Sequence, residues 1–245
     1  MVVAPPPALP PAPTSTATVP SALGALSNGD ERSDADRALD PGRHPTETIA
    51  FFGIAPGQRV AELGSGSGYT AELLARAVGP TGTVYGQNPK WLLEKFAEKP
   101  WSARLAKPVM KNVTRLDREF DDPFPADVKG LDAVISVLFY HDTVWLKVDR
   151  DKMNRAAFAA LRSGGIYGII DHSAQPGSGL RDVKTFHRID EAALKAEVLR
   201  AGFKLADEAN FLQNPADTRD WSDAPNAAAD RRGTSDRFVL KFVKP

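Results

Sequence analysis

The chain has 245 residues, which is enough for one α/β domain with extensions but short for two full domains. Its 31 basic side chains balance 31 acidic ones, so it lacks the electrostatic footprint of most nucleic-acid-binding proteins. Cysteine is absent, which excludes disulfides, thiolate metal sites and cysteine nucleophiles. No uncharged apolar run approaches the roughly 20 residues that a membrane span needs. We therefore expect no nucleic-acid partner and no membrane span.

The N-terminal segment, residues 1–28, is rich in proline and alanine and carries no charged side chain. Such a composition buries too little apolar surface to offset the entropy of ordering, so we predict a disordered tail before a domain at residues 29–245. The segment lacks the basic start and apolar stretch of a signal peptide. We expect a cytoplasmic protein, or a periplasmic one whose signal peptide has been removed.

The first half of the domain alternates between helical and strand patterns. Helical patterns, broken near Pro41 and Pro45, predict a cover over residues 29–56. Strands are predicted at residues 59–63, 83–86 and, more weakly, 112–116. Helices are predicted at residues 70–78 and at about 89–96.

The second half continues the alternation. Residues 131–138 form an apolar run typical of a buried parallel strand, and a helix at about 149–161 and a strand at 166–170 follow. Asp190 is the predicted N-cap of a helix that reaches residue 201. Two last strands, 203–212 and 237–243, enclose a polar insertion at 213–235 that is too long for a plain hairpin turn, and we predict a lid-like cover there. The pattern indicates a doubly wound α/β sheet with a terminal hairpin.

A glycine-rich turn joins the strand at residues 59–63 to the next helix. Gly64, Gly66 and Gly68 stand at every second position, and such a turn lets the backbone pass very close to a ligand. Dinucleotide-binding enzymes use a similar loop, but their third glycine falls one residue later, where this chain has Tyr69. An acidic residue, Glu62, also lies inside the strand, two positions before the first glycine.

The run Glu-Leu-Gly-Ser-Gly-Ser-Gly at residues 62–68 resembles motif I of the class I, Rossmann-like methyltransferases, which use S-adenosylmethionine. From about Arg32 to Pro245 the chain is also similar to a bacterial group of predicted methyltransferases. The stretches that carry this similarity are residues 32–34, 43–45, 51–57, 82–86, 171–172, 186–190 and 236–242. The resemblance implies a mostly parallel sheet of seven strands with an antiparallel last strand and helices on both faces. The cofactor then lies across the carboxyl ends of the first strands.

The resemblance also implies residues that bind S-adenosylmethionine and its product, S-adenosylhomocysteine. Those predicted in and beside the glycine loop, near the methionine half, are Glu62, Gly64, Ser65, Gly66, Gly68 and Tyr69. The class normally holds the ribose with an acidic residue at the end of the second strand, where this chain has Asn88. An amide bonds a hydroxyl without the charge-assisted strength of a carboxylate. Glu119 and Phe120 stand where the class contacts adenine, although Glu119 is equally typical of a solvated surface carboxylate.

Methyl transfer from a sulfonium needs proximity, and a base where the acceptor must lose a proton. Ligands of open α/β sheets bind at the carboxyl edge of the strands, and all four histidines fall in segments predicted to approach that edge. We predict His141, His172 and His187 as base or substrate anchor and Tyr140 as a further substrate contact. The alternatives are hydrogen bonds that stabilise loops for the histidines, and packing under the fourth strand for Tyr140.

A metal site at the same edge is an alternative. His141, His172, His187 and Asp171 are residue types that suit zinc or iron. No pair of them has the close helical spacing of a His-x-x-x-His site, so we predict no bound metal and keep a metal-dependent activity as a rival hypothesis.

The predicted function is methylation of a small-molecule acceptor by a monomer or homodimer. Residues 136–140 read Ser-Val-Leu-Phe-Tyr and lack the Asn/Asp-Pro-Pro-Tyr element of enzymes that methylate planar nitrogens, which favours O-, C- or S-acceptors. Asn88 motivates one rival, a protein that binds the cofactor or its product but has lost or changed its activity. A nicotinamide-dependent enzyme on the same fold is another.

Overall fold

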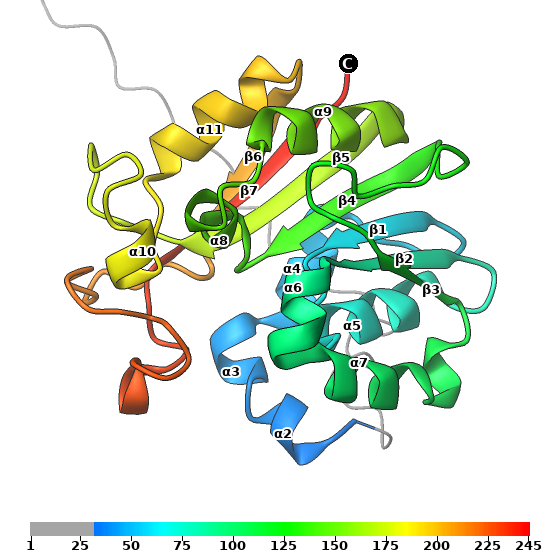
Figure 1. Cartoon of the computed structure of the whole chain (residues 1–245), viewed down its shortest axis with the longest axis horizontal. Coiled ribbons are helices and arrows are strands. Elements are labelled where there is room, and N and C mark those ends of the chain that lie inside the picture. Colours follow the sequence, from blue (N-terminus) through cyan, green and yellow to red (C-terminus); the bar gives the residue numbers. More distant parts are fainter. Residues whose placement is uncertain (1–31) are drawn as a thin grey trace, which may run out of the picture.

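Seven strands form one sheet in the order β3-β2-β1-β4-β5-β7-β6 in the computed structural model, which describes residues 32–245 (Figure 1). The strands are β1 (Arg59–Leu63), β2 (Thr83–Asn88), β3 (Val113–Asp117), β4 (Leu131–Val137), β5 (Leu161–His172), β6 (Lys204–Ala209) and β7 (Arg237–Val243). Strand β7 pairs antiparallel with both β5 and β6, and β1 to β5 pair in parallel. The predicted doubly wound sheet with an antiparallel last strand is confirmed. The predicted tail lies outside the described residues.

The burial of the two central strands explains why the sequence has nearly continuous apolar runs at these positions. Strand β1 is buried from Val60 onward, and β4 is buried at five of its seven positions. Helices cover both faces of the sheet, so these strands need apolar side chains on both sides rather than an alternating pattern.

Helices from the two halves of the chain lie on opposite faces (Figure 1). One face carries α4 (Pro45–Phe52), α5 (Tyr69–Val78), α6 (Lys90–Leu92), the π-helical turn η1 (Leu93–Ala97) and α7 (Glu98–Leu105). The other carries α9 (Arg150–Ala160) and α11 (Glu191–Arg200). Short helices complete the chain: α2 (Asp34–Arg37), α3 (Asp40–Arg43), η2 (Pro108–Met110), α8 (Tyr140–Trp145), α10 (Val183–Phe186) and η3 (Ala229–Arg231). None of the helices between residues 32 and 245 has the length and apolarity of a membrane span.

Among the helices beside the site that were not predicted are α7 and α8. The helix expected at residues 89–96 continues through η1 into α7, although Pro100 lies in its path. Pro100 is the third residue of α7 and comes soon after the π-helical turn η1. A proline has no N–H for a helical hydrogen bond, and π-helical turns are places where the regular helical bonding is interrupted. Helix α8 has only six residues, too few for a periodic apolar pattern, and it begins directly after the end of β4.

The predicted cap of α11 is present. The Asp190 carboxylate accepts a hydrogen bond from the backbone N–H of Ala192, and the helix begins at the next residue, Glu191. The polar insertion at 213–235 contains only η3 as regular structure. Its base is attached through Arg188, which is fully buried and forms an ion pair of 2.7 Å with Asp217.

Candidate cofactor and acceptor site

The glycine loop is held by two buried amide side chains at the end of β2. The Gly64 N–H donates to Gln87 Oε1 at 3.0 Å, and the Gly66 N–H donates to Asn88 Oδ1 at 2.7 Å. Asn88 Nδ2 donates in return to the Gly66 carbonyl oxygen at 3.1 Å. A carboxylate has no proton to donate to that carbonyl, which gives a structural reason for an amide at Asn88. The contact of Asn88 with ribose stays a prediction.

The three glycines of the loop meet different surroundings. All have positive φ, at 72° for Gly64, 55° for Gly66 and 85° for Gly68. A Cβ at Gly64 would lie 2.7 Å from the Phe139 ring, and one at Gly68 would overlap the Trp101 ring. Within the described chain, a Cβ at Gly66 would meet no atom inside 4 Å. The outer glycines are thus required by packing, and the middle one borders open space that a cofactor can approach.

Glu62, at the end of β1, is a buried acid beside this open space. The Glu62 Oε2 atom and the Ser65 hydroxyl have no hydrogen-bond partner among the described residues. Burial raises the pKa of the Glu62 carboxyl to about 7, against the opposing effect of the nearby Ser65 and Thr70 hydroxyls and, more weakly, of the Arg43 and Arg104 cations. S-adenosylmethionine carries a sulfonium and an ammonium, so a buried carboxyl with one unpaired oxygen, in the same strand–loop motif as Gly66, fits its methionine half.

The N-terminal cover is tied to the loop by polar contacts. The Tyr69 hydroxyl donates to Asp40 at 2.6 Å, and the Arg43 guanidinium lies 4.6 Å from the centre of the Tyr69 ring. Arg104 donates to the Ser67 carbonyl oxygen at 2.7 Å and pairs with Asp36 at 2.8 Å. Arg104 and Asp36 are 68 residues apart, so no local signal in the sequence predicted this pair.

The two residues predicted near adenine differ in exposure. Phe120 is buried, and its ring centre lies 5.2 Å from that of Phe139. Glu119 accepts an exposed hydrogen bond of 3.3 Å from the backbone N–H of Lys90. Contact of either residue with adenine stays a prediction.

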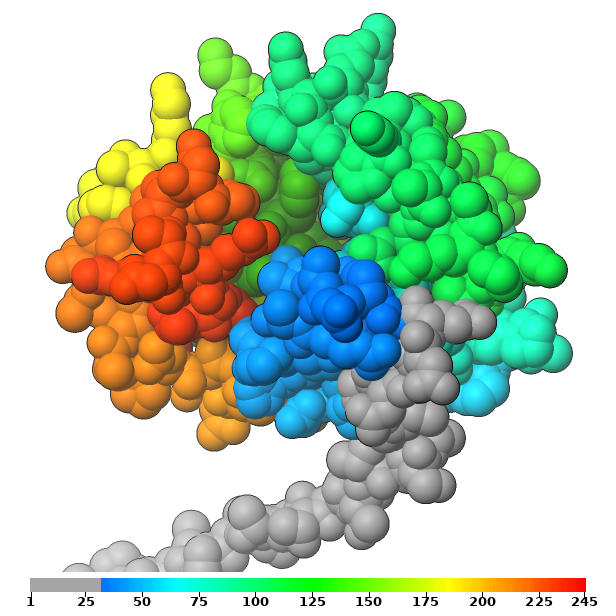
Figure 2. All heavy atoms as spheres, turned by 90° about the horizontal axis from the view of Figure 1, so that it is seen from below, coloured from blue at the N-terminus to red at the C-terminus, as the bar shows by residue number. Residues whose placement is uncertain are grey.

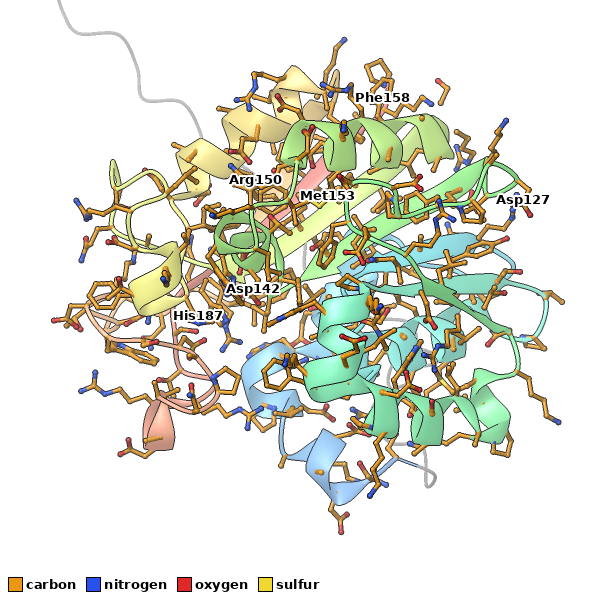
Figure 3. All side chains as sticks on the ribbon, in the orientation of Figure 1. Asp127, Asp142, Arg150, Met153, Phe158 and His187 are labelled. Carbon is orange, nitrogen blue, oxygen red and sulfur yellow. The ribbon has the colours of Figure 1, made fainter. Side chains whose placement is uncertain are left out.

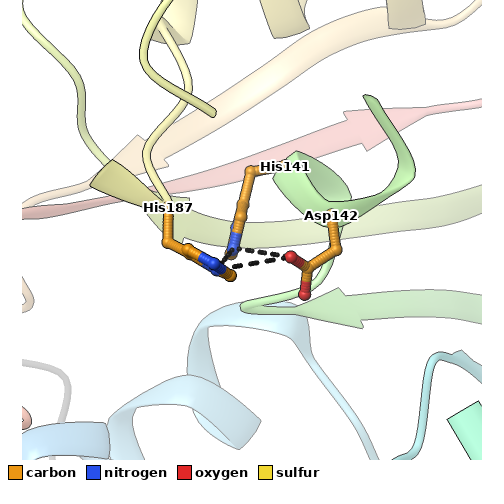
Figure 4. A group of neighbouring side chains, drawn as sticks. All are labelled: His141, Asp142 and His187. Carbon is orange, nitrogen blue, oxygen red and sulfur yellow. Dashed lines mark hydrogen bonds and ion pairs between the residues drawn. The ribbon is translucent and has the colours of Figure 1, made fainter. Parts of the chain in front are cut away.

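Three of the predicted histidines come together at the carboxyl ends of β4 and β5. His141 Nδ1 lies 2.7 Å from Asp171 Oδ1, and His141 Nε2 lies 3.2 Å from His187 Nδ1. The His141 and His172 ring centres are 5.5 Å apart. Figure 3 shows Asp142 and His187 facing each other between α8 and α10, and Figure 4 shows His141 beside them. Asp142, which the sequence analysis did not single out, belongs to this group.

His172 has its own acidic partner in the polar insertion. Its Nδ1 atom lies 2.7 Å from Asp223 Oδ2 and 2.8 Å from the Ser235 hydroxyl. Arg237, the first residue of β7, donates to the same Ser235 hydroxyl at 3.0 Å. The insertion therefore contacts the histidine edge directly, as a lid-like cover requires.

The three histidines have different protonation equilibria. Burial lowers the pKa of His141, but Asp171 and Asp142 outweigh it and raise that pKa to about 10. Burial lowers the pKa of His172 to about 4, although Asp223 acts in the opposite direction. Burial also lowers the pKa of His187.

Tyr140 and His44 are not brought to this group. Tyr140 is fully buried, and its hydroxyl donates to Glu197 at 2.9 Å and accepts from Asn154 at 2.8 Å. Those partners belong to α9 and α11, which favours the packing alternative for Tyr140, and its contact with a substrate stays a prediction. His44 lies 3.3 Å from Glu47 and packs near Phe211 instead.

A hollow opens at the edge of the sheet where the loop and the histidines lie. Figure 2 shows it bordered by the N-terminal helices in blue, the η1–α7 segment in blue-green and the C-terminal insertion in orange and red. A separate cavity of about 20 Å³ is lined by residues of the N-terminal cover, of α5 and of the strand ends, including Arg43, Tyr69, Leu138 and Arg237. That volume suits about one water molecule, so the room for larger ligands lies in the open hollow.

Comparisons with known proteins agree with this geometry. The family model of protein-L-isoaspartate (D-aspartate) O-methyltransferases matches residues 44–111, which contain the glycine loop. An arsenite methyltransferase of Halobacterium salinarum is 27% identical over 185 residues, covering 70% of this chain and 44% of that protein. The chain thus spans less than half the length of this curated relative.

Solved structures extend the likeness over most of the sheet. A SAM-dependent methyltransferase from Aquifex aeolicus has a TM-score of 0.59 at 17% identity, covering 86% of this chain and 97% of its own. The [4+2]-cyclase SpnF has a TM-score of 0.59 at 16% identity, covering 93% of both chains. With the observed strand order and glycine loop, these likenesses show that the chain has the fold of the class I, S-adenosylmethionine-dependent methyltransferases.

Proposed function

We propose that the protein transfers a methyl group from S-adenosylmethionine to a small-molecule acceptor. The observation that carries the proposal is the pairing of an open-sided Gly66 with the unpaired, buried carboxyl oxygen of Glu62. A cationic methionine moiety satisfies this carboxyl, whereas an apolar or anionic ligand leaves it unpaired.

Two neighbouring regions of the site have different roles in the proposed reaction. Glu62 attracts the cationic half of the cofactor, and Gln87 and Asn88 keep the loop in the shape that admits it. The cofactor, when bound, supplies the methyl group on its sulfonium. His141, whose raised pKa keeps it protonated, anchors the acceptor, and His172 or His187, whose pKa values are lowered, anchors the acceptor or accepts its proton. The insertion at 213–235 excludes water from this edge.

The acceptor is proposed to be a small molecule with a reacting O, C or S atom. The zero net charge does not favour a nucleic acid, and the hollow is lined by segments that partly cover it. Arsenite, the acceptor of the Halobacterium salinarum relative according to its name, is not proposed for this chain. As(III) is a soft centre that prefers thiolates, and this chain has no cysteine.

Calorimetric titration with S-adenosylmethionine and S-adenosylhomocysteine tests the cofactor half of the proposal. We expect both to bind, and we expect Glu62→Gln to weaken the charged donor more than the product, which lacks the sulfonium charge. Glu72→Gln is a matched control, because Glu72 is a buried acid of the next helix that is already paired with Arg76, Arg104 and Lys107. Failure of the wild-type protein to bind either compound would contradict the proposal.

A second function, cofactor binding without methyl transfer, is favoured by Asn88. Both polar atoms of its amide are engaged by Gly66, and the position lacks the carboxylate that the class uses for ribose. SpnF, a [4+2]-cyclase, has a similar fold. Transfer of a radiolabelled methyl group to a panel of phenols, thiols and carbon acids separates the two, because a repurposed protein binds the cofactor and labels none of them.

A further inference from the structure

Three potential ligand atoms at the histidine edge form a nearly equilateral triangle (Figure 4). His141 Nε2 lies 3.2 Å from His187 Nδ1 and 3.3 Å from Asp142 Oδ1. The third side, from His187 Nδ1 to Asp142 Oδ1, is 3.4 Å. The three side chains come from α8 and from the residue that ends α10, so two separate segments converge on one point.

The sides of this triangle match tetrahedral coordination better than octahedral coordination. Zinc binds imidazole nitrogen at about 2.0–2.1 Å, and a tetrahedron with that radius has edges of about 3.3–3.4 Å. An octahedral ion at the same radius has adjacent ligands only about 2.9 Å apart. Two imidazoles and one carboxylate are also a ligand set of catalytic zinc sites, which keep a fourth position open.

Neighbouring residues already orient the candidate ligands. Asp171 is fully buried and accepts three N–H groups, from the His141 ring at 2.7 Å, the His141 backbone at 2.7 Å and the His172 backbone at 2.8 Å. With Nδ1 of His141 donating to this carboxylate, Nε2 is the atom left to bind a metal, which displaces the proton that the raised pKa keeps there. Trp145 Nε1 donates to Asp142 Oδ1 at 2.7 Å and fixes the third ligand.

The group is accessible from one side. The side chain of His141 is 3% exposed, whereas those of Asp142 and His187 are 16% and 25% exposed. The deep ligand is therefore enclosed, and the other two lie where an ion and a further ligand can enter.

We propose that His141 Nε2, His187 Nδ1 and Asp142 Oδ1 bind a zinc ion, with Asp171 orienting His141 and the fourth position open to a ligand. His172, included in the metal alternative of the sequence analysis, is not in the triangle because Asp223 and Ser235 engage its Nδ1 atom. Metal binding stands independently of methyl transfer. A role for the ion in holding an oxygen or sulfur atom of the acceptor rests on the proposed methyltransferase function.

Zinc titration of the untagged, chelator-treated full chain, in competition with a chromophoric chelator, tests the site. We expect one Zn²⁺ per chain. Loss of a residue that hydrogen-bonds to a zinc ligand typically weakens zinc binding by about 10–100-fold. Removal of a ligand itself, in His187→Ala or Asp142→Asn, should therefore weaken zinc binding by more than about 100-fold. Asp142→Asn keeps an oxygen for Trp145, and His187 is partly exposed, so both variants are expected to fold.

His44→Ala is the matched control, because it removes one imidazole from the surface outside the triangle. Its affinity should stay within about twofold of the wild-type value. Substitution by Co²⁺ gives a second readout, since its visible spectrum should indicate tetrahedral coordination and change in His187→Ala. The proposal is overturned if the wild-type chain binds no stoichiometric zinc, or if His44→Ala weakens binding as much as His187→Ala. Binding of S-adenosylmethionine, measured separately, decides the cofactor proposal.

Discussion

The glycine loop and the histidine edge lie at the same carboxyl side of one sheet, but they are assembled differently. The loop is built from two short stretches, residues 62–69 and 87–88, and its contacts are mainly to backbone atoms. The histidine edge draws ionisable side chains from four stretches, at 141–142, 171–172, 187 and 223–237. A motif therefore specifies the first region locally, whereas only the topology of the sheet assembles the second.

The largest expected effect is a loss of stability at the histidine edge, which depends on a buried charge as the glycine loop does not. Asp171→Ala leaves the buried His141 ring and two backbone N–H groups without their acceptor, so we expect a loss of about 3–5 kcal/mol in the free energy of unfolding. Urea denaturation measures it. Asp149→Ala, which removes only the exposed cap of α9, is the control and should change stability far less. Equal losses in both variants would mean that the edge does not depend on the Asp171 charge.

In the glycine loop the comparison is between neighbouring glycines. Gly64→Ala forces a Cβ into the Phe139 ring at a positive φ, and we expect a loss of about 2–4 kcal/mol in the free energy of unfolding. Gly66→Ala meets only the backbone strain, about 1–2 kcal/mol, but places a methyl group in the proposed cofactor space. Denaturation and calorimetry together should show stability lost mainly in the first variant and cofactor affinity lost mainly in the second. The reverse pattern would contradict the assignment of Gly64 to packing.

Asn88→Asp distinguishes a loop-holding residue from a ribose-binding one. The carboxylate cannot donate to the Gly66 carbonyl, so we expect about 1–3 kcal/mol lower stability and no gain in cofactor affinity. A residue used mainly for ribose would instead bind the cofactor more tightly as a carboxylate. Asn112→Asp, which removes a similar amide-to-backbone donation remote from the loop, controls for the loss of the donor itself.

The smallest expected effect is a pH dependence. Burial raises the pKa of Glu62 to about 7, so the carboxyl becomes charged mainly between pH 6 and 8. The charged form attracts the cationic cofactor, and affinity for the cofactor should therefore rise by up to about 10-fold over that range.

The raised pKa of Glu62 also affects stability, because the folded state holds a proton that the unfolded state has released. Stability from this group therefore falls as pH rises from about 4.5 to 7. Calorimetry at several pH values should give a flat profile for Glu62→Gln.

Much of the fold was predictable from the sequence. The buried strands, the glycine loop and the Asp190 cap each have a local physical signature, and each is present in the structure. The predicted strand at residues 166–170 proved to be the central part of β5, whose earlier residues follow directly from α9. Helix α7 was missed because Pro100 is also compatible with a chain break.

The candidate site was predictable in part, for physical reasons that differ between residues. Strand order alone predicts that His141 and His172 share an edge. Tyr140 is next to His141 in sequence but points to the opposite side, because consecutive residues of a helix face different directions. The partners Asp142 and Asp223 depend on how α8 and the insertion fold back, which no local pattern encodes.

The reciprocal bonds between Asn88 and Gly66 have a consequence for the rate of ligand capture. These bonds hold the loop through contacts within the protein, so we expect little backbone entropy to be lost when the cofactor enters. The helices α2 and α3 border the hollow and are attached to the domain by the Arg104–Asp36 ion pair and the Tyr69–Asp40 hydrogen bond, so we expect them to influence ligand entry. Loosening that fastening should speed both association and release while leaving the amide proton of Gly66 protected from exchange.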